Sequence, residues 1–151
     1  MKSSKLRPIN FPKKEVISTL DEIPILMTIA SMIHGVSIFN LGYFNMKILK
    51  GKEEDRIKKM SENLKAFGVR TIVTKNSMKI YGKNPQIFSQ KKPIKIKATL
   101  DHRIQMCALV RAICCGQSTI VYGCETIRTS FPNFFLLLKE ICVKFKYEIQ
   151  K

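Results

Sequence analysis

Acidic residues are scarce in this chain of 151 residues: 11 Asp and Glu stand against 27 Lys and Arg, which gives a formal net charge of +16. An excess of this size is typical of proteins that meet an anionic partner, either a nucleic acid or a phosphorylated metabolite. A plainer interpretation is that most of the lysines, which are scattered along the chain, only solvate its surface. Arginine recognises planar phosphate and carboxylate groups better than lysine does, so the six arginines are weighed separately.

Long apolar runs are also missing. The longest extends over residues 23–33, which is too short for a bilayer span, and it ends at His34. The N-terminus is basic, but no apolar stretch of the kind found in secretory signals follows it. These absences predict a soluble, cytoplasmic protein with no membrane partner.

No group of cysteines has the spacing of a metal site. There are five cysteines, an odd number, and three of them lie in or beside apolar helical runs. Buried, reduced thiols in a cytosolic protein explain such a set best, so we expect no metal ion. The five are Cys107, Cys114, Cys115, Cys124 and Cys142.

The order of predicted elements is written twice, which is a signature of repeat architecture. At 45% apolar residues, the chain is long enough to bury a real core as one domain. The first copy, about residues 5–85, is predicted as an extended entry at 6–11, a helix at 21–33 capped by Thr19 or Asp21 and ended by Gly35, a strand at 36–40, a helix at 53–67 capped by Gly68, and strands at 69–74 and 78–81. The second copy, about residues 93–151, is predicted as a strand at 93–98, a helix at 101–116, a strand at 118–122, a helix at 130–143 with Pro132 in its first turn, and a strand at 145–149.

Lys52, Glu53 and Arg56 form the first candidate site, at the expected start of a helix. Lys52 and Arg56 are four residues apart, so on a helix they would share one face. Together with free backbone N–H groups they would make a seat for an anion, and Glu53 could donate or accept a proton. The alternative is an ordinary charged first turn on a solvated helix, in which the acidic residues only complement the helix dipole.

Asp101, His102 and Arg103 form the second candidate site, also at a predicted helix start. Asp101 suits the N-cap position, and Asp21 has the same possibility at the matching place in the first copy. A lone histidine such as His102 is usually structural or exposed. Arg103 begins an otherwise apolar helix, so its charge requires a partner.

Four short motifs occur in order along the chain: residues 21–26 (DEIPIL), 52–56 (KEEDR), 101–106 (DHRIQM) and 129–135 (TSFPNFF). Together they resemble the C-terminal part of 5-enolpyruvylshikimate-3-phosphate synthases, also called 3-phosphoshikimate 1-carboxyvinyltransferases. The resemblance extends over nearly the whole chain, but only over the C-terminal part of a family enzyme. UDP-N-acetylglucosamine enolpyruvyl transferases share the fold and resemble these motifs less closely.

The resemblance implies an α/β fold. Family enzymes have two domains, each built of three βαβαββ units in an inside-out α/β barrel, and residues 1–151 would form two such units of an incomplete C-terminal domain. This agrees with the pattern that is written twice, so we expect the units to pack through their helices with the sheets outward. One apolar side would then be bare, and the chain would associate with itself or with a separate N-terminal half.

The resemblance also implies a reaction. The enolpyruvyl group of phosphoenolpyruvate moves to the 5-hydroxyl of shikimate 3-phosphate through a tetrahedral intermediate, with release of phosphate and without a redox cofactor or an obligatory metal. By motif match, phosphoenolpyruvate would meet Lys52, Arg56 and Arg103, with His102 as an accessory donor near its phosphate. Asp21 would orient and deprotonate the hydroxyl, and Glu53 would transfer a proton at the methylene carbon.

Several positions differ from the family pattern, and two of them bear on affinity for an anion. Glu54 replaces a usual Ser or Thr and adds negative charge to the expected anion site, and Ile48 replaces a polar residue. The N-terminal motifs of the family that bind the phosphate of shikimate 3-phosphate have no counterpart. We therefore expect the chain to be half of a split enzyme or a decayed remnant, and to be inactive alone. The alternative is a non-catalytic basic module that binds anions or nucleic acid. Nucleic-acid binding is disfavoured, because the aromatic residues lie mostly at core spacing rather than at exposed positions that could stack bases.

Overall fold

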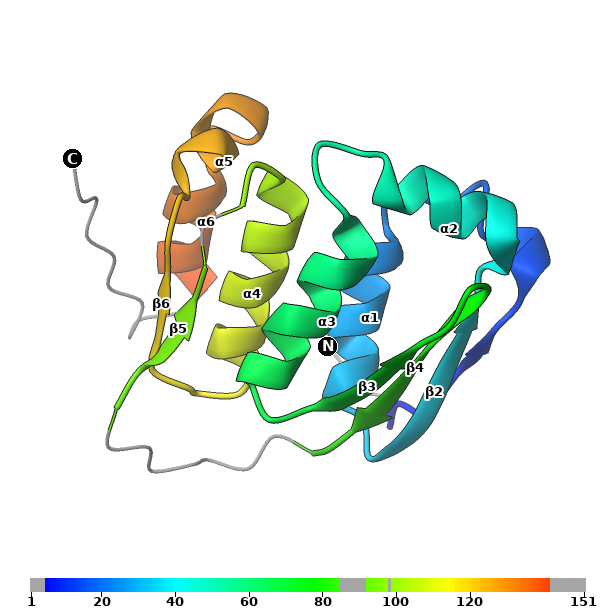
Figure 1. Cartoon of the computed structure of the whole chain (residues 1–151). Coiled ribbons are helices and arrows are strands. Elements are labelled where there is room, and N and C mark those ends of the chain that lie inside the picture. The colour runs from blue at the N-terminus through cyan, green and yellow to red at the C-terminus, as the bar shows by residue number, and fades with distance from the viewer. Residues whose placement is uncertain (1–4, 85–91, 98, 142–151) are drawn as a thin grey trace.

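Three helices lie side by side between two sheets in the computed structural model, which describes residues 5–84, 92–97 and 99–141 (Figure 1). The central helices are α1 (Ile23–Ser31), α3 (Arg56–Ala66) and α4 (His102–Cys114). This layering agrees with the expected α/β class and with sheets on the outside. The sheets are open, and within the described ranges no closed barrel is formed.

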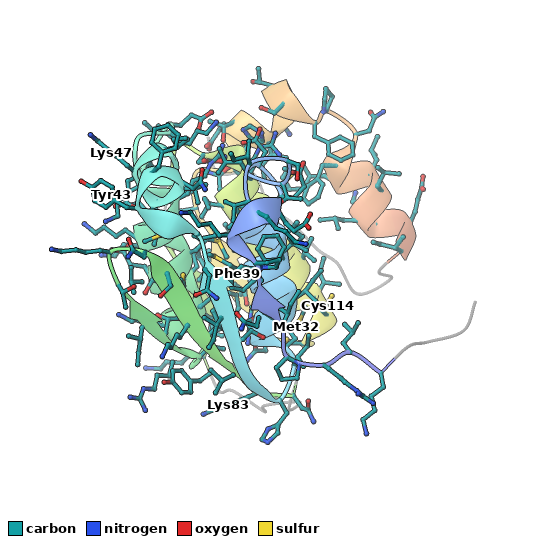
Figure 2. The ribbon with its side chains drawn as sticks, turned by 90° about the vertical axis from the view of Figure 1, so that its right-hand side faces the viewer. Met32, Phe39, Tyr43, Lys47, Lys83 and Cys114 are labelled. Carbon is teal, nitrogen blue, oxygen red and sulfur yellow. The ribbon has the colours of Figure 1, made fainter. Side chains whose placement is uncertain are left out.

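The larger sheet belongs to the first half of the chain and has the strand order β1-β2-β4-β3. β1 is parallel to β2, whereas β4 is antiparallel to both of its neighbours. Phe39 of β2 is fully buried in the main core together with Met27 of α1 (Figure 2). The strands are β1 (Asn10–Phe11), β2 (Gly35–Asn40), β3 (Arg70–Val73) and β4 (Ser77–Gly82).

The second half repeats the first part of this arrangement. β5 (Ile94–Ile96) pairs in parallel with β6 (Thr119–Val121), and α4 connects them. In the first half α1 connects the parallel pair β1 and β2 in the same way. The structure therefore shows one strand–helix–strand motif twice, while the exact borders of the two units stay a prediction.

Several predicted elements begin or end elsewhere in the structure. α1 follows Glu22, which makes no side-chain cap, so neither Thr19 nor Asp21 is its N-cap, although Pro24 does lie in the first turn. The helix ends at Ser31, and Gly35 starts β2 with a φ of 124° instead of ending the helix. Asp21 is therefore available for other contacts.

The helix α3 begins three residues later than predicted. Asp55 has an extended backbone, and its carboxylate accepts a hydrogen bond from the Lys58 N–H at 2.9 Å. Lys52 and Glu53 consequently precede the helix and do not share a helical face with Arg56. The predicted end is confirmed: Gly68 has a φ of 75°, its N–H bonds to the Lys65 carbonyl, and the Val69 N–H bonds to the Leu64 carbonyl.

The helices α2, α5 and α6 differ from the predicted elements. α2 (Gly42–Lys50) occupies a segment for which the sequence predicted no helix, and its Tyr43 and Lys47 project into solvent (Figure 2). The single helix expected at 130–143 is divided into α5 (Glu125–Ser130) and α6 (Phe134–Ile141). Pro132 separates them, because proline lacks an N–H and disfavours a helical residue before it, and the backbone of Phe131 is accordingly not helical, with φ −146° and ψ 78°. The strand predicted at 145–149 lies outside the described residues.

The cysteines are free, as predicted, at the four positions that the structure describes, but they are not all buried. Burial raises the pKa of Cys107 to about 12 and that of Cys124 to about 11. Cys114 is exposed, because it lies on the outer side of the last turn of α4, which corrects the expectation for this residue. Cys142 lies outside the described residues. No helix in the described ranges is long and apolar enough to cross a membrane.

Candidate functional site

The N-terminal ends of α1, α3 and α4 meet at one end of the molecule. Asp21 lies just before α1, Arg56 is the first residue of α3, and Asp101 is the N-cap of α4. The contacts among these three residues hold the helix ends together. Unpaired backbone N–H groups and the positive ends of the helix dipoles favour negative charge at such a place, which explains why carboxylates gather there.

Arg56 is the centre of this cluster and is only 2% exposed. Its Nε donates to Asp101 Oδ2 at 2.5 Å, its Nη1 to Asp21 Oδ1 at 2.7 Å, and its Nη2 to Glu53 Oε2 at 3.1 Å. Burial acts to lower the pKa of Arg56, but the hydrogen bonds to Asp101 and Asp21 outweigh burial and raise the pKa. The guanidinium is therefore permanently charged and fully engaged by protein carboxylates.

Asp21 forms ion pairs with all three candidate cations. Besides Arg56, the Lys52 Nζ lies 3.6 Å from Asp21 Oδ1, and the Arg103 Nη2 lies 3.6 Å from Asp21 Oδ2. The hydrogen bond from Arg56 is the largest cause that lowers the pKa of Asp21; partial burial opposes it, and the charges of Arg103 and Lys52 add to it. The Asp21 carboxylate is thus held ionised, and it is a weak base as long as these cations surround it.

The structure brings together five of the six predicted site residues and leaves the sixth beside them. Lys52, Glu53, Arg56 and Arg103 join Asp21 in one network, even though Lys52 and Glu53 precede the helix. The partner that the charge of Arg103 requires is Asp21. His102 is the first residue of α4 and is half-buried, and its imidazole makes no hydrogen bond or ion pair with the described residues.

Glu54 does not add its charge to the anion site, contrary to expectation. Its carboxylate accepts a short hydrogen bond from the Thr99 hydroxyl and lies 3.7 Å from the Lys59 Nζ. Glu53, Glu54 and Asp55 therefore have separate contacts: Arg56, the second half of the chain, and the first turn of α3. The negative charge of Glu54 is balanced away from Lys52 and Arg103.

The structure gives Asp101 a role beyond the predicted N-cap, and it adds Gln105 beside the site. The N-cap role of Asp101 is confirmed by the bond from the Arg103 N–H at 3.0 Å, but its buried carboxylate also binds Arg56, which the sequence did not indicate. Gln105 is fully buried, and its Nε2 donates to the carbonyls of Thr99, at 2.7 Å, and of Gly123. A buried glutamine in an apolar helix was the available signal, because such a group requires hydrogen-bond partners.

The accessible cations of the site are Lys52 and Arg103, whose side chains are 31% and 36% exposed, beside the exposed carboxylates of Asp21 and Glu53. An incoming anion would meet these two cations first, whereas Arg56 lies beneath the carboxylates. Among the described residues, no group of three His, Cys, Asp or Glu side chains is arranged to hold a metal ion. The geometry is suited to exchanging one carboxylate, that of Asp21, for a small ligand with carboxylate or phosphate oxygens.

Comparisons with known proteins identify the family of this chain. The family profile of EPSP synthase (3-phosphoshikimate 1-carboxyvinyltransferase) matches residues 2–138. A 3-phosphoshikimate 1-carboxyvinyltransferase of Clostridium tetani is 37% identical over 140 residues, which are 93% of this chain and 30% of that protein. The corresponding protein of Zymomonas mobilis is 36% identical over 152 residues, which are 100% of this chain and 33% of that protein.

A solved structure shows the same fold. The EPSP synthase of Acinetobacter baumannii superposes with a TM-score of 0.71 at 29% sequence identity, over 91% of this chain and 31% of that one. The chain thus spans about a third of the length of the relatives that it matches. These similarities support the enolpyruvyl transferase interpretation over the basic-module alternative, and the chain belongs to the EPSP synthase (3-phosphoshikimate 1-carboxyvinyltransferase) family.

Proposed function

We propose that this chain forms one wall of the active-site cleft of a 3-phosphoshikimate 1-carboxyvinyltransferase and that this wall binds phosphoenolpyruvate. The observation that carries the proposal is the convergence of Lys52, Arg56 and Arg103 on the single carboxylate of Asp21. Phosphoenolpyruvate offers one carboxylate and one phosphate, and arginine and lysine bind such groups through charge-assisted hydrogen bonds. The relatives named above are 3-phosphoshikimate 1-carboxyvinyltransferases, which supports this choice of ligand.

The site residues divide the work in the proposed reaction. Lys52 and Arg103 are accessible and contact the ligand, while the buried Arg56 holds Asp21 and Asp101 in place. Once the ligand shares these two cations, less positive charge surrounds Asp21, so Asp21 becomes a better base for the 5-hydroxyl of shikimate 3-phosphate. Glu53 is half-exposed beside Arg56 and is placed to exchange a proton with the methylene carbon. His102, next to Arg103, donates to the phosphate.

The second wall of the cleft is part of the proposal. Enolpyruvyl transfer requires both substrates to be aligned in a closed site from which water is excluded. We propose that a separate N-terminal half, or another chain, supplies the groups that bind shikimate 3-phosphate, and that these 151 residues alone release no phosphate from the two substrates. Free cysteines at the described positions support a cytoplasmic location.

A titration of the ¹⁵N-labelled chain with phosphoenolpyruvate tests the proposed ligand. An open, solvent-screened site predicts roughly millimolar binding, about 4 kcal/mol, with NMR shifts at Lys52 and Arg103. Arg103→Ala should weaken binding, and Arg128→Ala is the matched control because it removes a guanidinium from an exposed position of α5. Equal affinity of the two variants would show that the ligand does not bind at this cluster.

A further inference from the structure

We propose that Glu54 and Thr99 are positioning residues, whose mutual hydrogen bond holds the start of α4 against the start of α3 and so sets the distance between Arg56 and Arg103. The proposal rests on the proposed function for the choice of ligand, but its structural part stands without it. Glu54 lies in the turn before α3, and Thr99 lies in the segment before α4. Neither residue touches Asp21, Lys52 or Arg103 through any hydrogen bond or ion pair between described residues.

The Glu54–Thr99 contact runs parallel to the Arg56–Asp101 contact, and both join the start of α3 to the start of α4. Thr99 donates to Glu54, and Arg56 donates to Asp101; the partners are 45 residues apart in the sequence in both cases. Two connections that are separated by two residues fix both the position and the direction of the adjoining segments. Loss of the Glu54–Thr99 contact would leave the Arg56–Asp101 contact to align the two helix starts, aided by helix packing and by the Arg103–Asp21 pair.

Hydrogen bonds close these connections into a ring. The Thr99 hydroxyl accepts a hydrogen bond from the Asp101 N–H at 3.2 Å, and the Asp101 carboxylate accepts from Arg56 Nε. Arg56 also donates to Glu53, which is the covalent neighbour of Glu54, so the ring is completed in the turn before α3. A change at Thr99 is therefore transmitted to the guanidinium of Arg56 through Asp101, without any contact between Thr99 and a ligand.

The residues of this ring are largely buried, which strengthens the hydrogen bonds between them. Thr99 and Asp101 are buried, and only about a quarter of the Glu54 side chain is exposed. Lys59, which contributes the 3.7 Å ion pair, balances the charge of Glu54 from the α3 side. Gln105 holds the Thr99 carbonyl from below at 2.7 Å, and its Oε1 accepts a hydrogen bond from the Thr126 hydroxyl at 2.8 Å. Hydrogen bonds to a charged group are strong where water is excluded, and they are costly to break there.

NMR on the ¹⁵N-labelled chain without ligand tests the structural part. Thr99→Val removes the hydroxyl and keeps the shape of the side chain, and Glu54→Gln removes the charged acceptor. Both variants should shift the Nε–Hε resonance of Arg56 and the backbone amide of Arg103. Thr99→Ser keeps the hydroxyl and should resemble the parent, as should Thr74→Val, the matched control, whose hydroxyl bonds only within the β3–β4 turn.

The double variant provides the decisive comparison. If the contact exists as described, Thr99→Val and Glu54→Gln together shift the Arg56 resonance by less than the sum of the single changes. Additive shifts, or an Arg56 resonance that stays where it is in Thr74→Val, would overturn the positioning role even if stability falls. Should Thr99→Val fail to fold, the shift of the Arg56 resonance is compared between Glu54→Gln and Glu62→Gln, which changes an exposed position of α3. An equal shift in these two variants would likewise overturn the positioning role.

Phosphoenolpyruvate titrations separate this proposal from the proposed function. Thr99→Val should bind roughly tenfold more weakly than Thr74→Val, the size expected for one charged hydrogen bond acting through a neighbour. If the parent chain binds no phosphoenolpyruvate while the Arg56 resonance still responds to Thr99, the positioning role holds and the ligand assignment fails. If Thr99→Val binds as tightly as the parent, the positioning role is wrong and the ligand assignment is untouched.

Discussion

At the scale of single residues, Arg56 carries more of the site than any other side chain. Three carboxylates share its guanidinium, and two of them, Asp21 and Asp101, lie at the starts of the other two central helices. Asp101 is fully buried, so its charge is compensated mainly by this one arginine. Arg56 is therefore required for the fold before it is available to a ligand, which refines the expectation that it binds phosphoenolpyruvate directly.

Arg56→Ala should destabilise the chain by about 3–5 kcal/mol, because it leaves the buried carboxylate of Asp101 without a counter-ion. The measurement is urea-induced unfolding followed by circular dichroism. Lys58→Ala is the control, since it removes a cation from an exposed position of the same helix and should cost little. A loss in Arg56→Ala no larger than in Lys58→Ala would contradict the central role of Arg56.

Asp21 should make stability dependent on pH in the acid range. Its pKa is lowered from the ordinary value of 3.8, first by the hydrogen bond from Arg56, so the folded state binds the proton less readily than the unfolded chain. The resulting stabilisation is complete above 3.8 and is lost as the pH falls through the lower folded value. Asp21→Asn should therefore be less stable than the parent at neutral pH, and the difference should shrink in acid.

Unfolding free energies measured in steps from neutral pH to below the ordinary pKa check this expectation. Glu62→Gln, at an exposed position of α3, is the neutralising control, and we expect its difference from the parent to be small throughout. A difference between parent and Asp21→Asn that stays constant with pH would mean that the carboxylate is not held by these cations.

At the scale of elements, the three parallel helices favour negative charge at their N-terminal ends and positive charge at their C-terminal ends. Carboxylates and Arg56 gather at the starting ends, while Arg111, in the last turn of α4, lies at the other. Its Nε donates to the Ser31 hydroxyl at 3.0 Å at the end of α1, and its guanidinium lies 4.4 Å from the Phe67 ring centroid at the end of α3. A cation at three helix C-termini complements their dipoles, which explains a buried arginine that is bonded to neutral groups.

Close contact between β4 and the end of α1 requires Gly82. A Cβ atom at this position would lie 2.1 Å from the Ile33 carbonyl oxygen and 2.3 Å from that of Ala30. Gly82→Ala should therefore destabilise the chain by about 1–3 kcal/mol through forced displacement of backbone. Gly51→Ala is the matched control, because the nearest atoms would be 3.5 Å away; thermal melts of both variants show whether the strand end and the helix end are this close.

The sequence predicted the starts of the apolar helices α1 and α4 well and those of the mixed helices α2 and α3 poorly. α1 and α4 have strong apolar patterns, and both lie within a residue or two of their predicted starts. α2 was missed because Asn45 occupies a buried position among Met46 and Leu49, which obscures the apolar face. The start of α3 was misplaced because Glu53, Glu54 and Asp55 all suit a first helical turn, and only their tertiary partners distinguish the cap from the turn before it.

At the scale of the whole molecule, part of the apolar surface is left uncovered. α6 packs Phe134, Phe135 and Leu138 against α4, but Leu136 and Ile141 on its other side are 57% and 77% exposed. Among the described residues, one side of α6 thus exposes apolar side chains, whereas its two phenylalanines are buried. That a further unit would cover the exposed side stays a prediction. Exposed apolar groups of this kind mark an interface or a tendency to aggregate.

The chain should therefore associate with itself at high concentration, and glutamate at Leu136 and Leu137 should reduce both the association and the binding of an apolar dye. Sedimentation velocity under reducing conditions measures the effect. Thr129→Glu with Ser130→Glu adds the same charge at exposed polar positions of α5 and serves as the control. A parent chain that sediments as a monomer and binds no dye would show that these helices close their own core.

The sequence by itself determined the α/β class, the repeated strand–helix–strand order and the family, because these depend on apolar periodicity and on short motifs of fixed chemistry. It also predicted the candidate site residues, five of which the fold brings into one network. Only the tertiary structure decided how the charges are used. Pairing between Arg56 and Asp101, or between Glu54 and Thr99, joins residues 45 positions apart, and local patterns carry no information on such contacts. The same reason left Glu54 assigned to the anion site, although packing turns it toward Thr99 and Lys59.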